Sequence, residues 1–220
     1  MKLAVVVPYR DRHEHLIRFL PAIHHHLEAV DHQVVVVEQA RGKPFNRGML
    51  LNIGCELMDP DRTHLVLHDV DMLPEEVEYA PVTCPTHLAG AASQFRYALP
   101  YSTYFGGVTL FPVADFRRIN GFSNGYWGWG AEDDDLLDRC KHHGLQVDRV
   151  PGRFRSLAHV QAVQRPEHAT LHARNGLKLV RSRKHPEEYA TDGLSDLQYE
   201  LHHSTNPWSD ERDVQHLVGI

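Results

Sequence analysis

Short apolar runs alternate with helical periodicity over the first third of this chain. Apolar, largely β-branched residues dominate 3–7, 34–37 and 63–67. Between these runs, apolar residues recur every three or four positions over 13–30 and 47–58. Such short runs are typical of strands buried on both faces, and strands that alternate with helices form parallel sheets. The pattern therefore predicts an α/β fold with a mostly parallel central sheet flanked by helices.

The rhythm weakens in the rest of the chain. We expect a strand with a Gly-Gly step over 101–111, a helix over 132–143, a strand and loop over 145–160, and a polar helix over 166–185. Residues 201–220 are expected to form an edge strand and a tail. Ligands of open α/β sheets bind beyond the carboxyl ends of the strands, so polar residues at those ends are the candidate functional groups.

The composition is that of one globular domain. Hydrophobic residues make up 42% and charged residues 24% of the 220 residues, which is enough to bury a full core. The net charge of −6 argues against nucleic acid as a partner. No run approaches the roughly 18 apolar residues of a membrane span, and the apolar start is too short for a signal peptide. The three cysteines are widely spaced and expected to be reduced, so we predict a soluble, cytoplasmic protein without a transmembrane segment.

Two carboxylates, Asp69 and Asp71, follow the third predicted strand. Residues i and i+2 of a strand project to the same side, so this pair can hold one hard divalent cation and the diphosphate bound to it. Surface turns also carry Asp-x-Asp often. The position directly after an apolar strand favours the functional interpretation.

Basic and aromatic residues follow the first two strands. Arg10 and Arg12 suit a diphosphate, because guanidinium groups pair with phosphate in a bidentate way. Phe45 can stack on a nucleobase with Arg47 near the phosphates. The alternatives are a solvated turn with one arginine paired to an acid, and a basic loop with a helix cap at Asn46.

The segment 124–135 combines two tryptophans, three glycines and four consecutive acids, Glu132 to Asp135. Indole faces stack on pyranose rings, glycines let a loop fold over a ligand, and carboxylates accept hydrogen bonds from sugar hydroxyls. One carboxylate can also take a proton from an attacking hydroxyl. The alternative is a Gly-rich turn that leads into a helix whose dipole favours acids in its first turn.

Histidines offer fewer candidates. His159 can complete a metal shell begun by Asp71, although a lone histidine is more often structural. The i, i+4 pair His168 and His172 lacks the glutamate of an HExxH motif, so we interpret it as an exposed helix face. No nucleophile elbow, Walker loop or Rossmann glycine motif is present, which removes the simplest hydrolase, NTPase and dehydrogenase interpretations.

Together, these segments resemble the β-1,4-galactosyltransferase family (glycosyltransferase family 7) over about residues 5–199. The matching motifs occur in the family's order. They are Val7-Pro8-Tyr9-Arg10-Asp11-Arg12, Phe45-Asn46-Arg47, Asp69-Val70-Asp71, Tyr104-Phe105-Gly106-Gly107-Val108, Asn120-Gly121-Phe122, Tyr126-Trp127-Gly128-Trp129-Gly130 with Glu132-Asp133-Asp134-Asp135, and Asp192-Gly193-Leu194. One such motif is weak evidence, whereas seven in order are highly specific.

The resemblance implies a single GT-A domain over 1–220. Its nucleotide-sugar-binding half would cover about 1–110, its acceptor-binding and catalytic half about 111–205, and 206–220 would be a tail. The resemblance also implies Mn²⁺, with Mg²⁺ as a substitute, held by Asp71 and His159. Ser156 is doubtful as a third ligand.

The site residues follow from the same motif positions. Asp133 would be the general base, assisted by Glu132. The donor site would comprise Pro8, Tyr9, Arg10, Arg12, Phe45, Arg47, Asp69, Val70, Tyr104, Gly107, Trp129 and Gly130. The acceptor site would comprise Tyr101, Trp129, Asp133, Asp134, Lys178 and Leu179.

Several positions depart from the family pattern. Ser156 stands where animal members that act on N-acetylglucosamine have a methionine metal ligand, and Gln94 replaces a lysine. Lys178 and Leu179 fall roughly where an Arg-Phe pair forms the N-acetyl pocket, and Ala131 replaces a hinge glycine. We therefore expect a compact bacterial-type member with a different acceptor, such as xylose, glucose or a glycan precursor.

The expected reaction moves galactose from UDP-α-galactose to an acceptor hydroxyl and gives a β-linked, β-1,4 product. Tyr104 occupies a position that favours galactose in the family. UDP-GalNAc or UDP-Glc as donor is one alternative, and a non-catalytic sugar-binding module is another. A metallohydrolase built on histidines would need clustered ligands, which the spacing does not offer. The oligomeric state stays open.

Overall fold

The computed structural model describes residues 1–158, 166–208 and 210–220. The strands are β1 (Lys2–Tyr9), β2 (Asp31–Gln39), β3 (His64–His68), β4 (Met72–Glu76), β5 (Thr86–His87), β6 (Ala91–Ala92), β7 (Val108–Pro112), β8 (Asp148–Arg149), β9 (Arg153–Ser156), β10 (Glu200–Thr205) and β11 (Asp213–Gly219). The helices are α1 (His13–His26), α2 (Arg47–Leu57), α3 (Val113–Arg118), α4 (Glu132–His142) and α5 (Pro166–Lys184).

The strands form two sheets. The large sheet has the order β10-β11-β2-β1-β3-β7-β5-β8, and β11, β2, β1 and β3 run parallel to one another. The strand β7 is antiparallel to β3 and leads the chain toward the second half. A small sheet, β4-β9-β6, lies beside it. This arrangement confirms the predicted α/β fold with its mostly parallel sheet.

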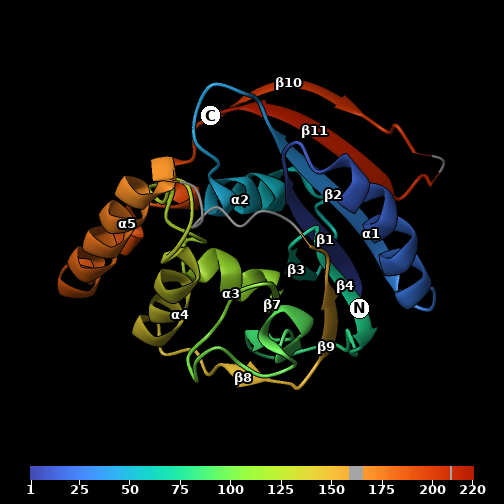
Figure 1. Cartoon of the computed structure of the whole chain (residues 1–220), viewed down its shortest axis with the longest axis horizontal. Coiled ribbons are helices and arrows are strands. Elements are labelled where there is room, and N and C mark those ends of the chain that lie inside the picture. Colours follow the sequence, from blue (N-terminus) through green and yellow to red (C-terminus); the bar gives the residue numbers. More distant parts are fainter. Residues whose placement is uncertain (159–165, 209) are drawn as a thin grey trace.

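The core lies on both faces of the large sheet. Along β1, Leu3, Val5 and Val7 pack with α1, whereas Ala4 and Val6 pack with α2. The helices α1 and α2 accordingly cover opposite faces of β1 and β2 (Figure 1). Side chains that alternate between two buried faces explain why the strands are continuous apolar runs in the sequence.

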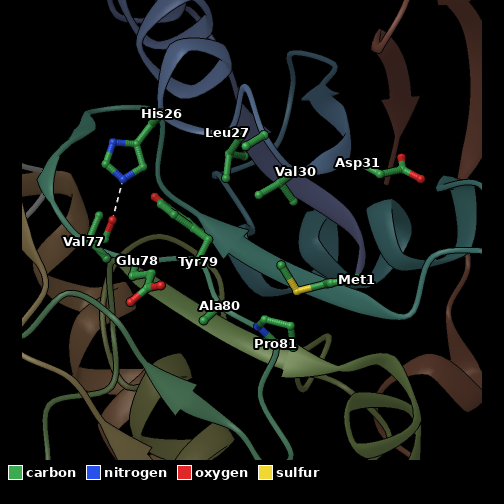
Figure 2. Close-up of a pocket in the computed structure, with 11 residues that line it drawn as sticks. Met1, His26, Leu27, Val30, Asp31, Val77, Glu78, Tyr79, Ala80 and Pro81 are labelled. Carbon is green, nitrogen blue, oxygen red and sulfur yellow. Dashed lines mark hydrogen bonds between the residues drawn. The ribbon is translucent and has the colours of Figure 1, made fainter.

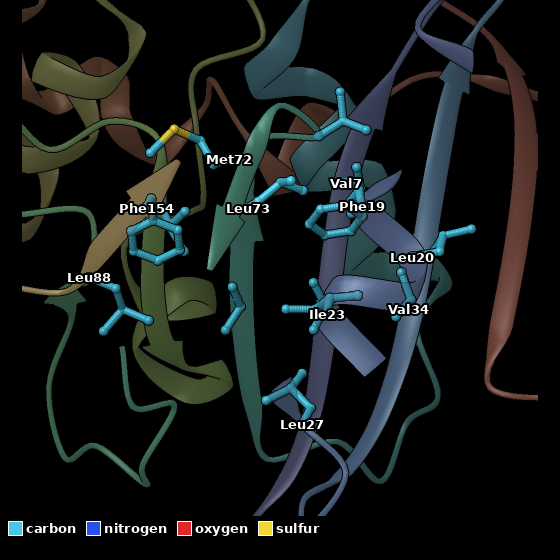
Figure 3. Packing of buried hydrophobic residues seen from close by; sticks show 14 of the residues in the cluster. Val7, Phe19, Leu20, Ile23, Leu27, Val34, Met72, Leu73, Leu88 and Phe154 are labelled. Atoms are coloured by element: carbon cyan, nitrogen blue, oxygen red, sulfur yellow. The ribbon is translucent and has the colours of Figure 1, made fainter. Parts of the chain in front are cut away.

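The core on the α1 face continues into the small sheet. Phe19 and Ile23 of α1, and Leu27 directly after it, point toward the strands of the large sheet (Figure 3). Leu73 of β4 and Phe154 of β9 belong to the same buried cluster. The chain segment after β3 is thereby held against α1, which fixes where β4 begins.

Two segments differ from the sequence-based expectation. The strand expected over 101–111 starts only at Val108, because Gly107 has a φ of +80° that interrupts an extended backbone. The segment expected to be a tail contains β11, which pairs parallel with β2 and leaves β10 as the exposed edge. Asp213, Gln215 and His216 interrupt the apolar run that marks the other buried strands, so β11 has no clear strand pattern in the sequence.

Within the described residues, no helix is both long and apolar enough to span a membrane. Cys55 and Cys140 are buried and Cys84 is partly exposed, all three as free thiols.

Candidate active site

The pair Asp69 and Asp71 lies where β3 ends and the small sheet begins. The Asp69 amide donates to the Gly107 carbonyl at 3.0 Å, which ties this turn to the segment before β7. The Leu157 amide donates to the Asp71 carbonyl at 2.8 Å, beside the β4–β9 pairing of Met72 with Ser156. Both acids therefore stand at the carboxyl edge of the sheet, as the sequence predicted.

The first turn of α2 also faces this edge. The Asn46 side chain accepts from the Met49 amide at 3.0 Å and so caps the helix. The side-chain nitrogen Nδ2 of Asn46 donates to the Asn124 carbonyl at 2.8 Å. The cap that the sequence offered as an alternative role is real, and it also places the next residue, Arg47, between the two halves of the site.

The acids of the 124–135 segment lie at the start of α4. Gly130 and Ala131 both have positive φ, of +104° and +75°, and the chain then enters the helix at Glu132. A positive φ strains alanine, which lacks the freedom of glycine. The turn points Glu132 and Asp133 toward Arg47 rather than along the protein surface.

Arg47 joins the two groups of acids. Its Nε donates to Asp69 Oδ1 at 2.6 Å and its Nη1 donates to Asp133 Oδ1 at 2.8 Å. Glu132 lies 3.9 Å from the same Nη1. One largely buried guanidinium thus connects the turn after β3 with the start of α4.

Negative charge exceeds positive charge at this point. Burial raises the pKa of Asp69 to about 6, with Asp71 and Asp133 adding to the shift and Arg47 opposing it. Burial and the adjacent Asp133 raise the pKa of Glu132 to about 8, again against Arg47. Carboxylates crowded in this way, with Asp71 among them, have the oxygen-donor chemistry and uncompensated charge that fit a hard divalent cation.

The described residues supply only part of a metal shell. No group of three or more His, Cys, Asp or Glu side chains in the described ranges has the geometry to hold a metal. The predicted ligand His159 lies outside the described residues. The Ser156 hydroxyl donates to the Met72 sulfur at 3.3 Å, which gives it a partner within the protein.

The predicted nucleotide residues lie on the same rim. Pro8 and Tyr9 are buried at the end of β1. The Arg10 guanidinium lies 5.3 Å from the centre of the Phe45 ring. Arg12 occupies the N-cap position of α1. The structure therefore brings Arg10 and Phe45 together as a cation–aromatic pair.

Tyrosines border the acids on another side. The Tyr101 hydroxyl donates to Asp134 Oδ1 at 3.3 Å, and its ring meets Tyr104 edge to face at 5.6 Å. Tyr104 leads into the Gly106-Gly107 step. Tyr101 is 46% exposed, which leaves its ring accessible to a ligand.

Trp129 lies on the glycine-rich loop before α4 and is 47% exposed. Its ring packs on His172 of α5 with a centroid distance of 5.0 Å. The Asn175 side chain donates to the carbonyls of Trp127 and Trp129 at 3.1 and 3.3 Å. His172 thus contacts the loop that carries Trp129. The structure does not describe the side chain of the other predicted histidine, His168.

Lys178 and Leu179 lie on α5. Lys178 Nζ donates to Asp192 Oδ2 at 2.9 Å and lies 5.4 Å from the Tyr126 ring centre. Leu179 is buried. Asp192 also accepts from the Ser123 hydroxyl at 2.6 Å, so this region braces the loop that precedes Trp127.

Sequence reasoning missed two residues next to the site. His87 donates to the Gly106 carbonyl at 2.9 Å, and Arg149 donates to the Tyr104 carbonyl. Both belong to two-residue strands with no periodic pattern, so no sequence signal singled them out.

A surface pocket lies elsewhere, at the amino ends of β1 and β2. Met1, Leu27 and Val30 line it together with the segment from Val77 to Pro81, and His26 donates to the Val77 carbonyl (Figure 2). It contains none of the predicted site residues.

Two family models match successive parts of this chain. Residues 1–85 match the family described as the N-terminal region of glycosyl transferase group 7, and residues 86–163 match the N-terminal domain of galactosyltransferase. Human β-1,4-galactosyltransferase 5 is 37% identical over 215 residues, covering 90% of this chain and 51% of that protein. Mouse β-1,4-galactosyltransferase 1 is 41% identical over 167 residues, covering 72% of this chain and 42% of that protein. The chain thus spans about half the length of the curated relatives it matches.

Solved structures of similar fold include a member of the same family. The catalytic domain of Drosophila β-1,4-galactosyltransferase 7, in complex with xylobiose, superimposes with a TM-score of 0.79 at 29% identity, covering 100% of this chain and 94% of that one. A GalNAc-T7 structure with a TM-score of 0.60 and 13% identity, covering 86% of this chain and 50% of that one, shares the fold alone. This GT-A chain belongs to the β-1,4-galactosyltransferase family, glycosyltransferase family 7.

Proposed function

We propose that this chain is a metal-dependent inverting glycosyltransferase that moves galactose from UDP-α-galactose to a sugar hydroxyl. The observation that carries the proposal is the Arg47 bridge between Asp69 and Asp133. Asp69 lies at the edge where we expect the diphosphate to bind, and Asp133 is the expected base. One guanidinium contacts both carboxylates. In a displacement reaction, the leaving-group site and the base must both be held close to the reacting carbon.

The family supports the choice of donor and metal. A mutant of Drosophila β-1,4-galactosyltransferase 7, 28% identical with a TM-score of 0.80, was solved with manganese, UDP-Gal and xylobiose, and the match covers 100% of this chain and 94% of that one. We carry these ligand classes over to this chain as UDP-galactose, Mn²⁺ and a saccharide acceptor. Mg²⁺ is the expected substitute, because oxygen donors bind both ions.

Asp71 would hold the metal, together with His159 outside the described residues. When bound, a divalent cation supplies Lewis-acid stabilisation of the charge that grows on the departing diphosphate. Arg10 and Arg12 stand on the same rim and can pair with phosphate oxygens. Phe45, beside Arg10, offers an aromatic face to the base of the nucleotide.

Asp133 would act as the general base. The acceptor oxygen forms a bond to the anomeric carbon as the bond from that carbon to the UDP oxygen breaks, and the hydroxyl proton passes to Asp133. A single displacement from the opposite face turns an α-linked donor into a β-linked product. Arg47 holds the Asp133 carboxylate in place through an ion pair 2.8 Å long.

Glu132 would play a different part from its neighbour. Burial and the adjacent Asp133 raise the pKa of Glu132, so this side chain holds a proton more readily than an ordinary carboxyl group and can then donate a hydrogen bond to a sugar oxygen. Adjacent acids whose environments separate their pKa values can divide donor and acceptor roles in this way.

Residues around the acids would select the sugars. Tyr101, Asp134 and the exposed Trp129 border the acids and offer hydrogen-bonding and stacking groups to an acceptor. Tyr104 packs closely against Gly106 and occupies the position where the family's tyrosine favours galactose over an N-acetylated donor. The alternative is the same reaction with UDP-GalNAc or UDP-Glc. The β-1,4 linkage is carried over from the family name.

Isothermal titration of the wild type with UDP-galactose and UDP-GalNAc, with and without Mn²⁺, tests the donor site. We expect metal-dependent binding of UDP-galactose with the higher affinity. Asp71→Ala should remove the metal dependence, while Asp61→Ala, a surface acid paired with Lys2, should retain it. Absence of binding by either donor would contradict the proposal, and equal nucleotide affinity for Asp71→Ala and wild type in Mn²⁺ would remove Asp71 as the ligand.

A further inference from the structure

The turn formed by residues 104–107 has no regular secondary structure, yet each of its four carbonyls accepts a hydrogen bond. This turn connects Tyr104 to the start of β7. Arg149 Nη1 donates to the carbonyl of residue 104, the Thr109 hydroxyl to that of 105, and the Asp69 amide to that of 107. The carbonyl of residue 106 accepts from His87 Nε2 and from the Val108 amide. Two of these five donors are side chains of β5 and β8. An irregular segment whose carbonyls are all satisfied is held in one conformation.

The same turn touches the reacting side of the site. A Cβ atom added to Gly106 would lie 2.4 Å from Asp133 Oδ2 and 2.9 Å from the Tyr104 hydroxyl. The backbone of the turn is therefore packed against the proposed base. Through Gly107 the turn also holds the Asp69 amide. A shift of the turn would move the base, the tyrosine and the Asp69 turn relative to one another.

The hydrogen bonds define one tautomer for His87. The Gly106 carbonyl is an acceptor, so His87 Nε2 must carry the proton. Arg149 Nη1 is a donor, so His87 Nδ1, 3.2 Å away, must accept. Burial lowers the pKa of His87 to about 4, against the Gly106 hydrogen bond and with the help of Arg149. The ring is thus neutral and oriented at both nitrogens.

Arg149 also holds the 104–107 turn in place. It donates both to His87 and to the Tyr104 carbonyl, and its guanidinium lies 5.8 Å from the Phe105 ring centre. The His87 ring meets the Tyr104 ring edge to face at 5.5 Å. Arg149 and His87 therefore fix both the backbone and the side chain of Tyr104.

We propose that Arg149 and His87 are positioning residues for the reaction. They act through the 104–107 turn, which sets Tyr104 against Asp133 and so tunes the turnover rate and the choice of donor sugar. This inference rests on the proposed function. Neither residue touches the reacting atoms, so their effect is carried by geometry alone.

The test compares variants that keep or lose the hydrogen-bonding pattern. His87→Gln retains a donor and an acceptor, whereas His87→Leu retains only volume. Arg149→Lys and Arg149→Met form a second such pair. His26→Leu is the matched control, because His26 also donates to a backbone carbonyl but lies at the distant pocket of Figure 2. For each protein, kcat, KM for UDP-galactose, the UDP-GalNAc to UDP-galactose rate ratio and the thermal midpoint are measured.

We expect His87→Leu to lower kcat by about tenfold to 100-fold at a temperature where it is fully folded, because small misplacements of catalytic groups cost this much. Its donor rate ratio should change by at least about threefold, while His87→Gln and His26→Leu should stay within about threefold of wild type for both quantities. A merely structural role would lower the thermal midpoint and leave kcat and the donor ratio of the folded protein unchanged.

Unchanged kcat and donor ratio in folded His87→Leu and Arg149→Met would overturn the positioning role. So would an equal loss in His87→Gln and His87→Leu, since the hydrogen bonds would then be irrelevant. A wild type that transfers no sugar from any UDP donor would overturn the proposed function itself, and the positioning role with it. If the wild type is active and the variants keep its kcat and donor ratio, only the positioning role is overturned.

Discussion

At the scale of single residues, the site is organised by one arginine among several acids. The sequence placed Arg47 near the phosphates of a nucleotide and Asp133 among the catalytic acids. The structure shows the two side chains hydrogen bonded at 2.8 Å. No spacing rule predicts this contact, since 86 residues separate the partners. The motif identified the residue types, and only the fold decided which acid the guanidinium meets.

The substitution Asp133→Asn tests the role of the base. The amide cannot accept the acceptor proton, so kcat should fall by about 10²-fold to 10⁴-fold. UDP affinity should stay within about threefold of wild type, measured by calorimetry in Mn²⁺.

Asp138→Asn is the matched control, because Asp138 lies on the same helix and pairs with Arg183 at 2.7 Å on the exposed side. Its turnover should be close to that of wild type. Turnover of Asp133→Asn within tenfold of wild type would remove Asp133 as the base.

At the scale of elements, helix α2 lies unusually close to β1. A Cβ atom at Gly54 would come within 2.1 Å of Val6 Cγ1. The glycine therefore permits α2, which begins at Arg47, to pack closely on β1. The cost of a larger residue here would appear in stability and in the position of Arg47.

We predict that Gly54→Ala lowers the free energy of unfolding by about 1–3 kcal/mol, because it overpacks the core. The thermal midpoint should fall by about 2–4 °C for each kcal/mol. Gly176→Ala in α5 is the control, since no atom lies within 4 Å of a Cβ there, and it should be neutral or stabilising by up to about 1 kcal/mol. Equal midpoints for the two variants would show that the contact with Val6 is unimportant.

The elements also show what sequence patterns can predict. The apolar runs at 3–7, 34–37 and 63–67 correspond to β1, β2 and β3. Their burial on both faces leaves a signal in every residue. The strand β11 escaped prediction, because Gln215 and Leu217 are only partly buried and the buried positions include Asp213. Two-residue strands such as β5 and β8 are too short for any periodicity. The sequence therefore contains no indication that His87 and Arg149 contact the 104–107 turn.

At the scale of the whole molecule, the two expected halves share one core. The buried cluster on the α2 face includes Leu51 from the first half and Phe116 and Leu136 from the second. Continuous packing of this kind makes the relative placement of Asp69 and Asp133 a property of the entire fold. The division at about residue 110 stays a prediction.

Stability against pH offers a test of the buried state of His87. Its pKa is about 4 in the folded protein because the ring is buried, and near 6.5 in the unfolded chain. Between these values only the unfolded chain binds the proton, so His87 contributes stability that is fully present above pH 6.5 and is lost as the pH falls toward 4. The slope is about 1.4 kcal/mol for each pH unit.

His87→Gln lacks this proton, whereas every other titrating group is common to both proteins. The unfolding free energy of wild type minus that of His87→Gln, measured by chemical denaturation, should therefore decrease as the pH falls from 6.5 to 4. A constant difference across this range would show that His87 titrates alike in the folded and unfolded chain.

The central claim is that galactose passes from UDP-galactose to a sugar hydroxyl in one inverting displacement. The most direct measurement is proton NMR of the wild type with UDP-galactose, Mn²⁺ and a panel of xylose, glucose and N-acetylglucosamine glycosides, following the anomeric signals over time. The account predicts a new β-galactosyl signal with at least one acceptor, formed without a prior α-linked product. An α-galactoside, or release of free galactose with every acceptor, would contradict it.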